Sequence, residues 1–331
     1  MMYSDEDLDS AVKKGIFTKA AVLEFRTQFS NTPGSTAVDE ENFRLVTGFN
    51  DIFVVIACGL LLYSSYSVLG AINTVVSLLS LPLLAWGLAE FFVRKRKMAL
   101  PAMVLMLVFV GGVFALSRYL FSSASGITYV AATGLSAIAA FVHYQRFQVP
   151  ITVAAGAATA LGFIAATVLY YLPGAINSIL MIVLISGIFI FLLAMYWDAS
   201  DLKRTTRRTD VAFWLHLLSA PMIVHPIFAY LGILEGKEST VSIAIVIVLY
   251  LLMTLVSIII DRRAFMVSSL LYVMYALSNL FTIYGIVGYN LAATGVCIGG
   301  GLLLLSAFWR PVRSSIVKAI PVALQQFVPK T

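Results

Sequence analysis

The chain has 331 residues, of which 60% are hydrophobic and only 11% are charged. Soluble domains carry about 25% charged residues, so this composition excludes an ordinary water-soluble protein, a disordered chain and, with two cysteines, a disulfide-rich secreted scaffold. The formal net charge of +6 fits the enrichment of Lys and Arg in cytoplasmic loops of membrane proteins, so we predict a lipid bilayer and no nucleic acid as partner.

The first 42 residues are polar and predict a small cytosolic helical hairpin followed by a linker. Ser4 and Asp7 have the spacing of a capping box, Gly15 is a natural stop, and Thr18 is placed to cap a second helix. The apolar face of that second helix would consist of Val22, Phe25 and Phe29. Two readings of residues 1–42 stay open: a cap packed on the bundle, or an element for homo-oligomerisation or for docking a protein partner.

Residues 43–309 predict an all-α, polytopic transmembrane helical bundle of ten spans. A bilayer core about 30 Å thick needs roughly 20 apolar residues per helix. That window selects ten segments: 51–70, 73–93, 98–117, 126–142, 150–171, 175–196, 211–232, 240–260, 264–285 and 288–308. Residues 310–331 would form a cytosolic tail.

The distribution of cations orients the predicted spans. If the ten segments alternate across the membrane, all but two of the 22 Lys and Arg residues fall on one side. The two exceptions are Arg118 and Lys237. This asymmetry is typical of the positive-inside rule for an even number of spans, and it predicts that both termini are cytoplasmic.

Small residues and weak internal similarity give further predictions. Gly295 and Gly299 form a GxxxG pair in the tenth span, and residues 155–162 of the fifth span are also small, which favours close helix contacts in both. A faint echo between residues 90–96 and 258–263 is compatible with parallel duplication of four spans or with chance.

The seventh span predicts a polar pocket at membrane depth. Its two prolines remove backbone donors and free carbonyl groups, and broken helices in membranes often line a cavity. Polar side chains of the ninth span lie at a comparable depth. The predicted pocket therefore consists of His225, Asn279, Tyr275, Thr282, Pro221 and Pro226. In the alternative reading, His225 bonds a freed carbonyl and Asn279 bridges two helices.

The sequence carries little equipment for chemistry. His216 and His225 are nine residues apart, which turns them to opposite faces of one helix, so they cannot share a haem. Asp, Glu, Lys and Arg are missing from the middle of the predicted spans, and we find no catalytic constellation. We therefore expect neither enzymatic activity nor a cofactor or metal.

The longest internal cytosolic connector is residues 197–210, which mixes acidic and basic residues. Its cations would anchor the topology and contact anionic lipid headgroups. Alternatively, its aspartates would form a site for a partner or ligand.

The arrangement resembles a loosely defined group of uncharacterised bacterial multi-pass membrane proteins that have a short N-terminal helical hairpin and about ten spans. The similarity lies in residues 8–16, in Gly48-Phe49-Asn50-Asp51 and in residues 208–214. It implies a bacterial inner-membrane location and no particular activity. Function therefore stays between permease-like transport of a small solute and a non-transporting scaffold or assembly factor that acts through its hairpin and basic loops.

Overall fold

The computed structural model describes residues 5–30, 49–123, 126–202, 204, 206–232, 240–284, 288–321, 325 and 328. Within these residues the regular structure is entirely helical. The chain divides into two compact units, residues 1–43 and residues 44–331. Because the regular structure of the described residues is helical throughout, the all-helical fold class predicted from the sequence is confirmed.

The first unit contains two short helices, α1 (Asp5–Lys13) and α2 (Lys19–Ser30). Gly15 lies between them with a φ of +72°, which only glycine adopts without strain. The predicted cap is present, because the Ala21 amide donates to the Thr18 hydroxyl oxygen at 3.2 Å. Val22 is buried, whereas Phe25 is exposed. Ser4, the Phe29 side chain and the predicted linker from residue 31 onward lie outside the described residues.

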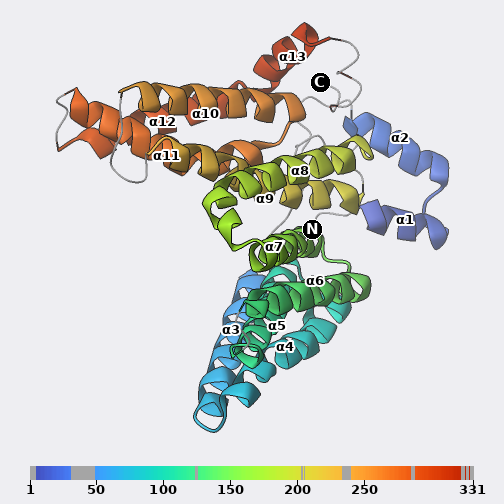
Figure 1. The fold of residues 1–331 in the computed structure, drawn as a ribbon. Helices are drawn as coiled ribbons and strands as arrows, with labels where there is room; N and C mark the ends of the chain where they lie inside the picture. The colour runs from blue at the N-terminus through green and yellow to red at the C-terminus, as the bar shows by residue number, and fades with distance from the viewer. Residues whose placement is uncertain are drawn as a thin grey trace. The chain divides into compact units, whose positions relative to one another are not determined.

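Each of the ten segments that hydropathy selects forms a helix in the second unit (Figure 1). Boundaries differ from the predicted ones by a few residues, as expected from fraying and capping. The helices are α3 (Phe49–Gly70), α4 (Thr74–Ala89), α5 (Ala99–Leu120), α6 (Ile127–Phe147), α7 (Ile151–Tyr171), α8 (Ile179–Ala199), α9 (Arg207–Tyr230), α10 (Thr240–Ile260), α11 (Arg263–Ile283) and α12 (Asn290–Ala307). A π-helical turn, η2 (Glu90–Lys95), extends α4, and a 3-10 turn, η3 (Pro173–Ser178), precedes α8.

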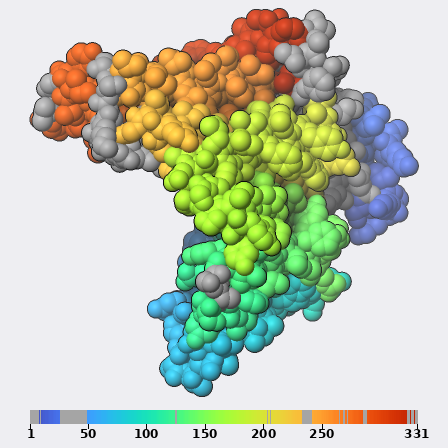
Figure 2. Space-filling model, in the orientation of Figure 1, coloured from blue at the N-terminus to red at the C-terminus, as the bar shows by residue number. Residues whose placement is uncertain are grey.

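Within the described part of the chain, nine helices are long and apolar enough to cross a membrane. The remaining segment, α11, contributes a shorter apolar stretch, Tyr272–Ile283. Large apolar side chains are exposed on these helices, among them Ile185, Phe189 and Leu192 of α8. Figure 2 shows α8, in yellow-green, on the face turned to the viewer. Such a surface suits hydrocarbon rather than water.

Glycines mark several close helix contacts. A Cβ at Gly112 of α5 would lie 2.9 Å from Pro82 Cδ of α4, and one at Gly187 of α8 would lie 2.8 Å from Met222 Cβ of α9. In the fifth span, a Cβ at Gly162 of α7 would lie 3.3 Å from Thr133 Cγ2 of α6, and one at Gly156 would be in ordinary contact with Ala140 at 3.5 Å, which confirms the close contact predicted for the small residues of this span.

The corresponding prediction for the tenth span is wrong within the described residues. A Cβ added at Gly295 or Gly299 would meet no described atom within 4 Å. The GxxxG face of α12 is therefore open in the described part of the chain, because a small-residue pattern specifies a possible contact and not its partner.

A common backbone turn ends four of the helices on one side. Lys97, Gln148, Arg204 and Asp261 are the four described non-glycine residues with positive φ, between 51° and 60°. Each follows a helix of even rank among the ten, and each precedes the start of the next helix by a few residues. We call the end of the bundle that bears the connectors 95–98, 148–150, 200–206 and 261–262 the cationic end.

The predicted tail begins with a further helix, α13 (Trp309–Ala319), that sequence analysis did not anticipate. Trp309, Arg313 and Val317 are buried at spacings of four, so one face of α13 packs against the bundle, where it contacts α10. This helix brings two polar side chains to the cationic end.

Candidate functional site

A buried ion pair joins the ends of α8 and α10 and forms the centre of the candidate site. The guanidinium of Arg262 donates to both carboxylate oxygens of Asp198, through Nη2 to Oδ1 and through Nε to Oδ2 at 3.2 Å. The same Nη2 donates to the Thr209 carbonyl at 3.2 Å. Arg262 is 1% exposed and Asp198 is 5% exposed. Both charges are therefore removed from solvent and depend on each other.

His216 of α9 lies beneath this pair. Its Nε2 is 2.9 Å from Asp198 Oδ2, and the side chain is fully buried between the rings of Phe191 and Phe265. Its Nδ1 has no hydrogen-bond partner among the described residues. Nine residues of α9 precede it, so the polar group reaches about 14 Å into the helix from its start. A buried donor or acceptor without a partner costs free energy, so the unpaired Nδ1 makes His216 an unusual buried side chain.

A second ion pair runs in the reverse direction. Arg204, in the connector after α8, donates to Asp261 Oδ2 at 3.0 Å and to the backbone carbonyls of Ile260 and Asp261. Arg262 after α10 thus pairs with Asp198 at the end of α8, and Arg204 after α8 pairs with Asp261 after α10. Burial lowers the pKa of the Arg204 guanidinium and the charge of Arg262 lowers it further, while Asp261 and Asp198 act in the opposite direction.

Helix α13 completes the coordination of Asp261. Trp309 Nε1 donates to Asp261 Oδ1 at 2.9 Å, and Arg313 Nε lies 3.4 Å from the same oxygen. The Trp309 ring also stacks under the Arg263 guanidinium at 4.9 Å. We call Asp198, Arg204, His216, Asp261 and Arg262 the ionic cluster.

Asp201 organises the connector that carries Arg204. Its Oδ2 accepts hydrogen bonds from the Thr206 amide at 2.8 Å, the Thr206 hydroxyl at 2.6 Å and the Thr209 hydroxyl at 3.1 Å. This bond set fixes the N-terminus of α9 relative to the end of α8. The conformation of the connector is therefore fixed by hydrogen bonds that do not involve α10.

Polar contacts also link the other connectors of the cationic end. Arg146 Nε and Nη2 contact the two carboxylate oxygens of Glu90 at 2.6 and 3.1 Å, and Arg207 donates to Gln148 Oε1 at 3.3 Å. The Glu90–Arg146 side chains are 30% and 41% exposed, in contrast to the ionic cluster. The acidic and basic residues near the even-ranked helix ends therefore meet one another.

The structure separates the two histidines of α9. His216 faces Asp198 of α8, whereas His225 is exposed and its Nδ1 lies 2.7 Å from the Tyr272 hydroxyl of α11. This agrees with the predicted opposite faces. His225 contacts α11 one turn before Tyr275, the first of the ninth-span residues in the predicted pocket.

The other residues of the predicted pocket are spread along α9 and α11. Asn279 is partly buried, Tyr275 and Thr282 are exposed, and Thr282 Oγ1 accepts a bond at 2.9 Å from Asn290 at the start of α12. Pro221 is exposed and Pro226 is buried, and α9 is continuous through both. The pocket stays a prediction, and the seventh span is not broken into two helices.

The ionic cluster was not predicted from the sequence, because its Asp and Arg residues lie near helix ends and the cations of residues 197–210 were expected to contact lipid headgroups. Arg204 corrects that assignment: it is directed into the protein, where Asp261 binds it. The available signal was that the connectors after the sixth and eighth spans each contain both Asp and Arg. Reciprocal pairing of those residues needed the three-dimensional arrangement.

Comparisons with protein families, with curated proteins and with solved structures give no match for this chain.

Proposed function

We propose that the chain is a permease-like protein of a bacterial inner membrane that moves a small solute along the region around α9. In this proposal α3 to α12 are ten membrane crossings, both termini are cytoplasmic, and the cationic end faces the cytoplasm. The distribution of Lys and Arg supports that orientation. The resemblance to uncharacterised bacterial multi-pass proteins supports the location.

The observation that carries this proposal is the reciprocal pairing of Arg262 with Asp198 and of Arg204 with Asp261. The pairs tie the α8–α9 helix pair to the α10–α11 helix pair at the cationic end. Buried charges near a membrane are costly and usually serve function. If the two helix pairs separated, water would solvate all four ions at once, so closed and open arrangements would both be satisfied.

The ionic cluster would then act as a gate at the cytoplasmic end. Behind it lie His216 and the fully buried Ser219, whose hydroxyl donates to the His216 carbonyl at 3.0 Å. Further along α9 lies His225, the centre of the pocket predicted from sequence. A solute released through the gate would pass these groups in turn.

Cysteine labelling tests the proposal without knowledge of the solute. Cys58 and Cys297 are first replaced, and Ser219→Cys and Asn279→Cys are then made separately in the full-length protein. A membrane-impermeant maleimide is applied from either face of sealed vesicles. A gate predicts that Asp198→Asn accelerates labelling at position 219 from the cationic face and slows labelling at position 279 from the other face. Faster labelling at position 219 without slower labelling at position 279 would contradict a transporter that opens one face of the membrane while it closes the other.

A non-transporting scaffold or assembly factor is the second candidate, and the first unit favours it. Among the described residues of this unit, four large apolar side chains are exposed, namely Ile16, Phe17, Leu23 and Phe25. Exposed apolar residues on a short helix and the turn before it are typical of a surface that meets a partner or another copy of the chain.

Deletion of residues 1–42 distinguishes the two candidates. If the protein is a scaffold, the shortened chain should no longer restore the phenotype of cells that lack the gene. The scaffold model makes no prediction about labelling at positions 219 and 279. In a permease, the reciprocal labelling at positions 219 and 279 should persist in the shortened chain. The matched control replaces only Leu23 and Phe25 by Ser and keeps the length of the chain.

A further inference from the structure

Two adjoining hollows lie between α3, α4, α5 and the start of α6, away from the ionic cluster. The first has a volume of about 390 Å³ and is lined mainly by apolar groups, and the second has a volume of about 620 Å³ and is richer in polar groups. Tyr66 of α3 lines both, so the two hollows meet the same side chain. We call the first the apolar crevice and the second the polar pocket.

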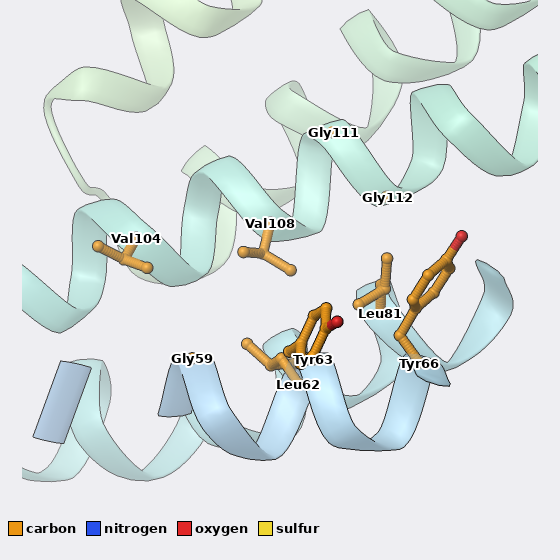
Figure 3. Close-up of a pocket in the computed structure, with 9 residues that line it drawn as sticks. All are labelled: Gly59, Leu62, Tyr63, Tyr66, Leu81, Val104, Val108, Gly111 and Gly112. Carbon is orange, nitrogen blue, oxygen red and sulfur yellow. The ribbon is translucent and has the colours of Figure 1, made fainter. Parts of the chain in front are cut away.

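The apolar crevice exists because glycines take the place of larger residues along its walls. Figure 3 shows Tyr63 and Tyr66 of α3 and Val104 and Val108 of α5 around the crevice, with Gly111 and Gly112 on the same helix. A Cβ added at Gly59 or at Gly111 would meet no described atom within 4 Å. By helical rise, the crevice extends for about 10 Å along α3 from Tyr66 to Gly59.

The polar pocket contains a single guanidinium surrounded by hydroxyl groups. Arg118 lies in the last turn of α5 and is exposed. The hydroxyl-bearing residues that line the pocket with it are Tyr66, Thr74, Tyr119, Ser122, Thr128 and Tyr129. Among the described residues Arg118 takes part in neither a hydrogen bond nor an ion pair.

The sequence supplies no nearby counter-charge for Arg118. Between Ile52 and Trp197 the only acidic residue is Glu90. Glu90 binds Arg146 and Arg94 near the start of α5, and Arg118 is 19 residues beyond that start, about 28 Å by helical rise. An anion for Arg118 must therefore come from outside this part of the chain.

We infer that the polar pocket and the apolar crevice together form a binding site for one anionic phospholipid. The phosphate would accept hydrogen bonds from Arg118 and from the tyrosine hydroxyls, and one acyl chain would lie in the crevice between α3 and α5. Charge complementarity selects an anionic headgroup, because the pocket pairs one cation with neutral donors. The crevice selects a lipid over a soluble anion, because its walls offer apolar contact from Tyr66 to Gly59.

The test measures lipid retained by the purified full-length protein, using native mass spectrometry after incubation with equal amounts of phosphatidylglycerol and phosphatidylcholine. Phosphatidylglycerol also binds the cations of the cationic end, so the readout is the difference between wild type and variants. Arg118→Gln should lower the affinity for phosphatidylglycerol about tenfold at one site and leave phosphatidylcholine unchanged, and Arg118→Lys should retain most of the preference.

The acyl-chain half of the site has its own matched pair of variants. Gly111→Leu places a side chain in the crevice without a clash and should also remove the preferentially bound lipid. Gly299→Leu makes the same change at another open helical position and should leave retention unchanged. Both variants must keep the wild-type circular dichroism spectrum, which separates loss of lipid from loss of fold.

Three outcomes would overturn the inference. Equal retention of the two lipids by wild type would show that the site has no anion preference. An affinity for phosphatidylglycerol that is the same in Arg118→Gln as in wild type would place the bound lipid elsewhere. Displacement of the lipid by inorganic phosphate, with no effect of Gly111→Leu, would indicate a site for a soluble anion.

Discussion

Replacement of Arg262 by Met is the most informative perturbation of the ionic cluster. It removes two charge-assisted hydrogen bonds to Asp198 and one to the Thr209 carbonyl. The Asp198 carboxylate then stays buried with His216 as its remaining described partner. Breaking a buried pair from one side costs about 3–5 kcal/mol, because the surviving charge is left without compensation. We expect the free energy of unfolding to fall by that amount.

Arg146→Met is the matched control. Arg146 also makes two contacts to one carboxylate, that of Glu90, at 2.6 and 3.1 Å. Its side chain is 41% exposed, so water solvates Glu90 when the partner is removed. The expected loss is roughly 0–1 kcal/mol. The two variants differ mainly in burial, and their comparison isolates desolvation.

Unfolding is followed by circular dichroism in mixed micelles as the fraction of dodecyl sulfate rises. The series includes Asp198→Asn alone and the double variant Asp198→Asn with Arg262→Met. Because Asn is neutral, the double variant should be more stable than the sum of the single losses by about 1–3 kcal/mol. Strict additivity, or a loss for Arg262→Met no greater than for Arg146→Met, would refute the view that the pair is desolvated and coupled.

Three further substitutions, one of them with a control, test packing and capping in the bundle, each followed by the same unfolding measurement. Gly187→Ala should lower the free energy of unfolding by about 1–3 kcal/mol, because its Cβ would lie 2.8 Å from a side-chain carbon of α9. The control Gly299→Ala should cost nothing and should gain up to about 1 kcal/mol of helix propensity. Equal effects of the two variants would contradict the close approach at Gly187. Trp309→Phe removes a donor to the buried Asp261 carboxylate and should cost about 1–3 kcal/mol, with faster proteolysis of α13, and unchanged cleavage would refute the anchoring role. Asn73→Ala removes the acceptor for two amides at the start of α4 and should cost about 1 kcal/mol, so a neutral result would mean that water replaces the cap.

Much of the helical architecture follows from the sequence because a span must satisfy its own backbone and cover it with apolar side chains. That requirement made the ten segments legible from hydropathy alone. Two local features were also predicted correctly: the Thr18 hydroxyl caps α2, and small residues around Gly156 allow α6 and α7 to approach each other. In each case the determining interaction lies within one helix or between consecutive helices.

The candidate sites could not be predicted because they depend on contacts between distant segments. Asp198 and Arg262 are 64 residues apart, and each taken alone resembles an ordinary charge at a helix end. The open face at Gly295 and Gly299 shows the converse, since a motif for close contact need not have an intramolecular partner. The apolar crevice arises from glycines on two helices that only their packing reveals as neighbours.

The recurrence of left-handed backbone at Lys97, Gln148, Arg204 and Asp261 has a consequence for how such a chain is assembled. Because the turn recurs after every second helix, the unit that would be added to or lost from the chain is a helical hairpin and not a single helix. In the proposed topology every hairpin adds two crossings, so gain or loss of one would leave the sidedness of all later segments intact. The number of hairpins could therefore vary among descendants of one ancestor without inverting the molecule in its bilayer.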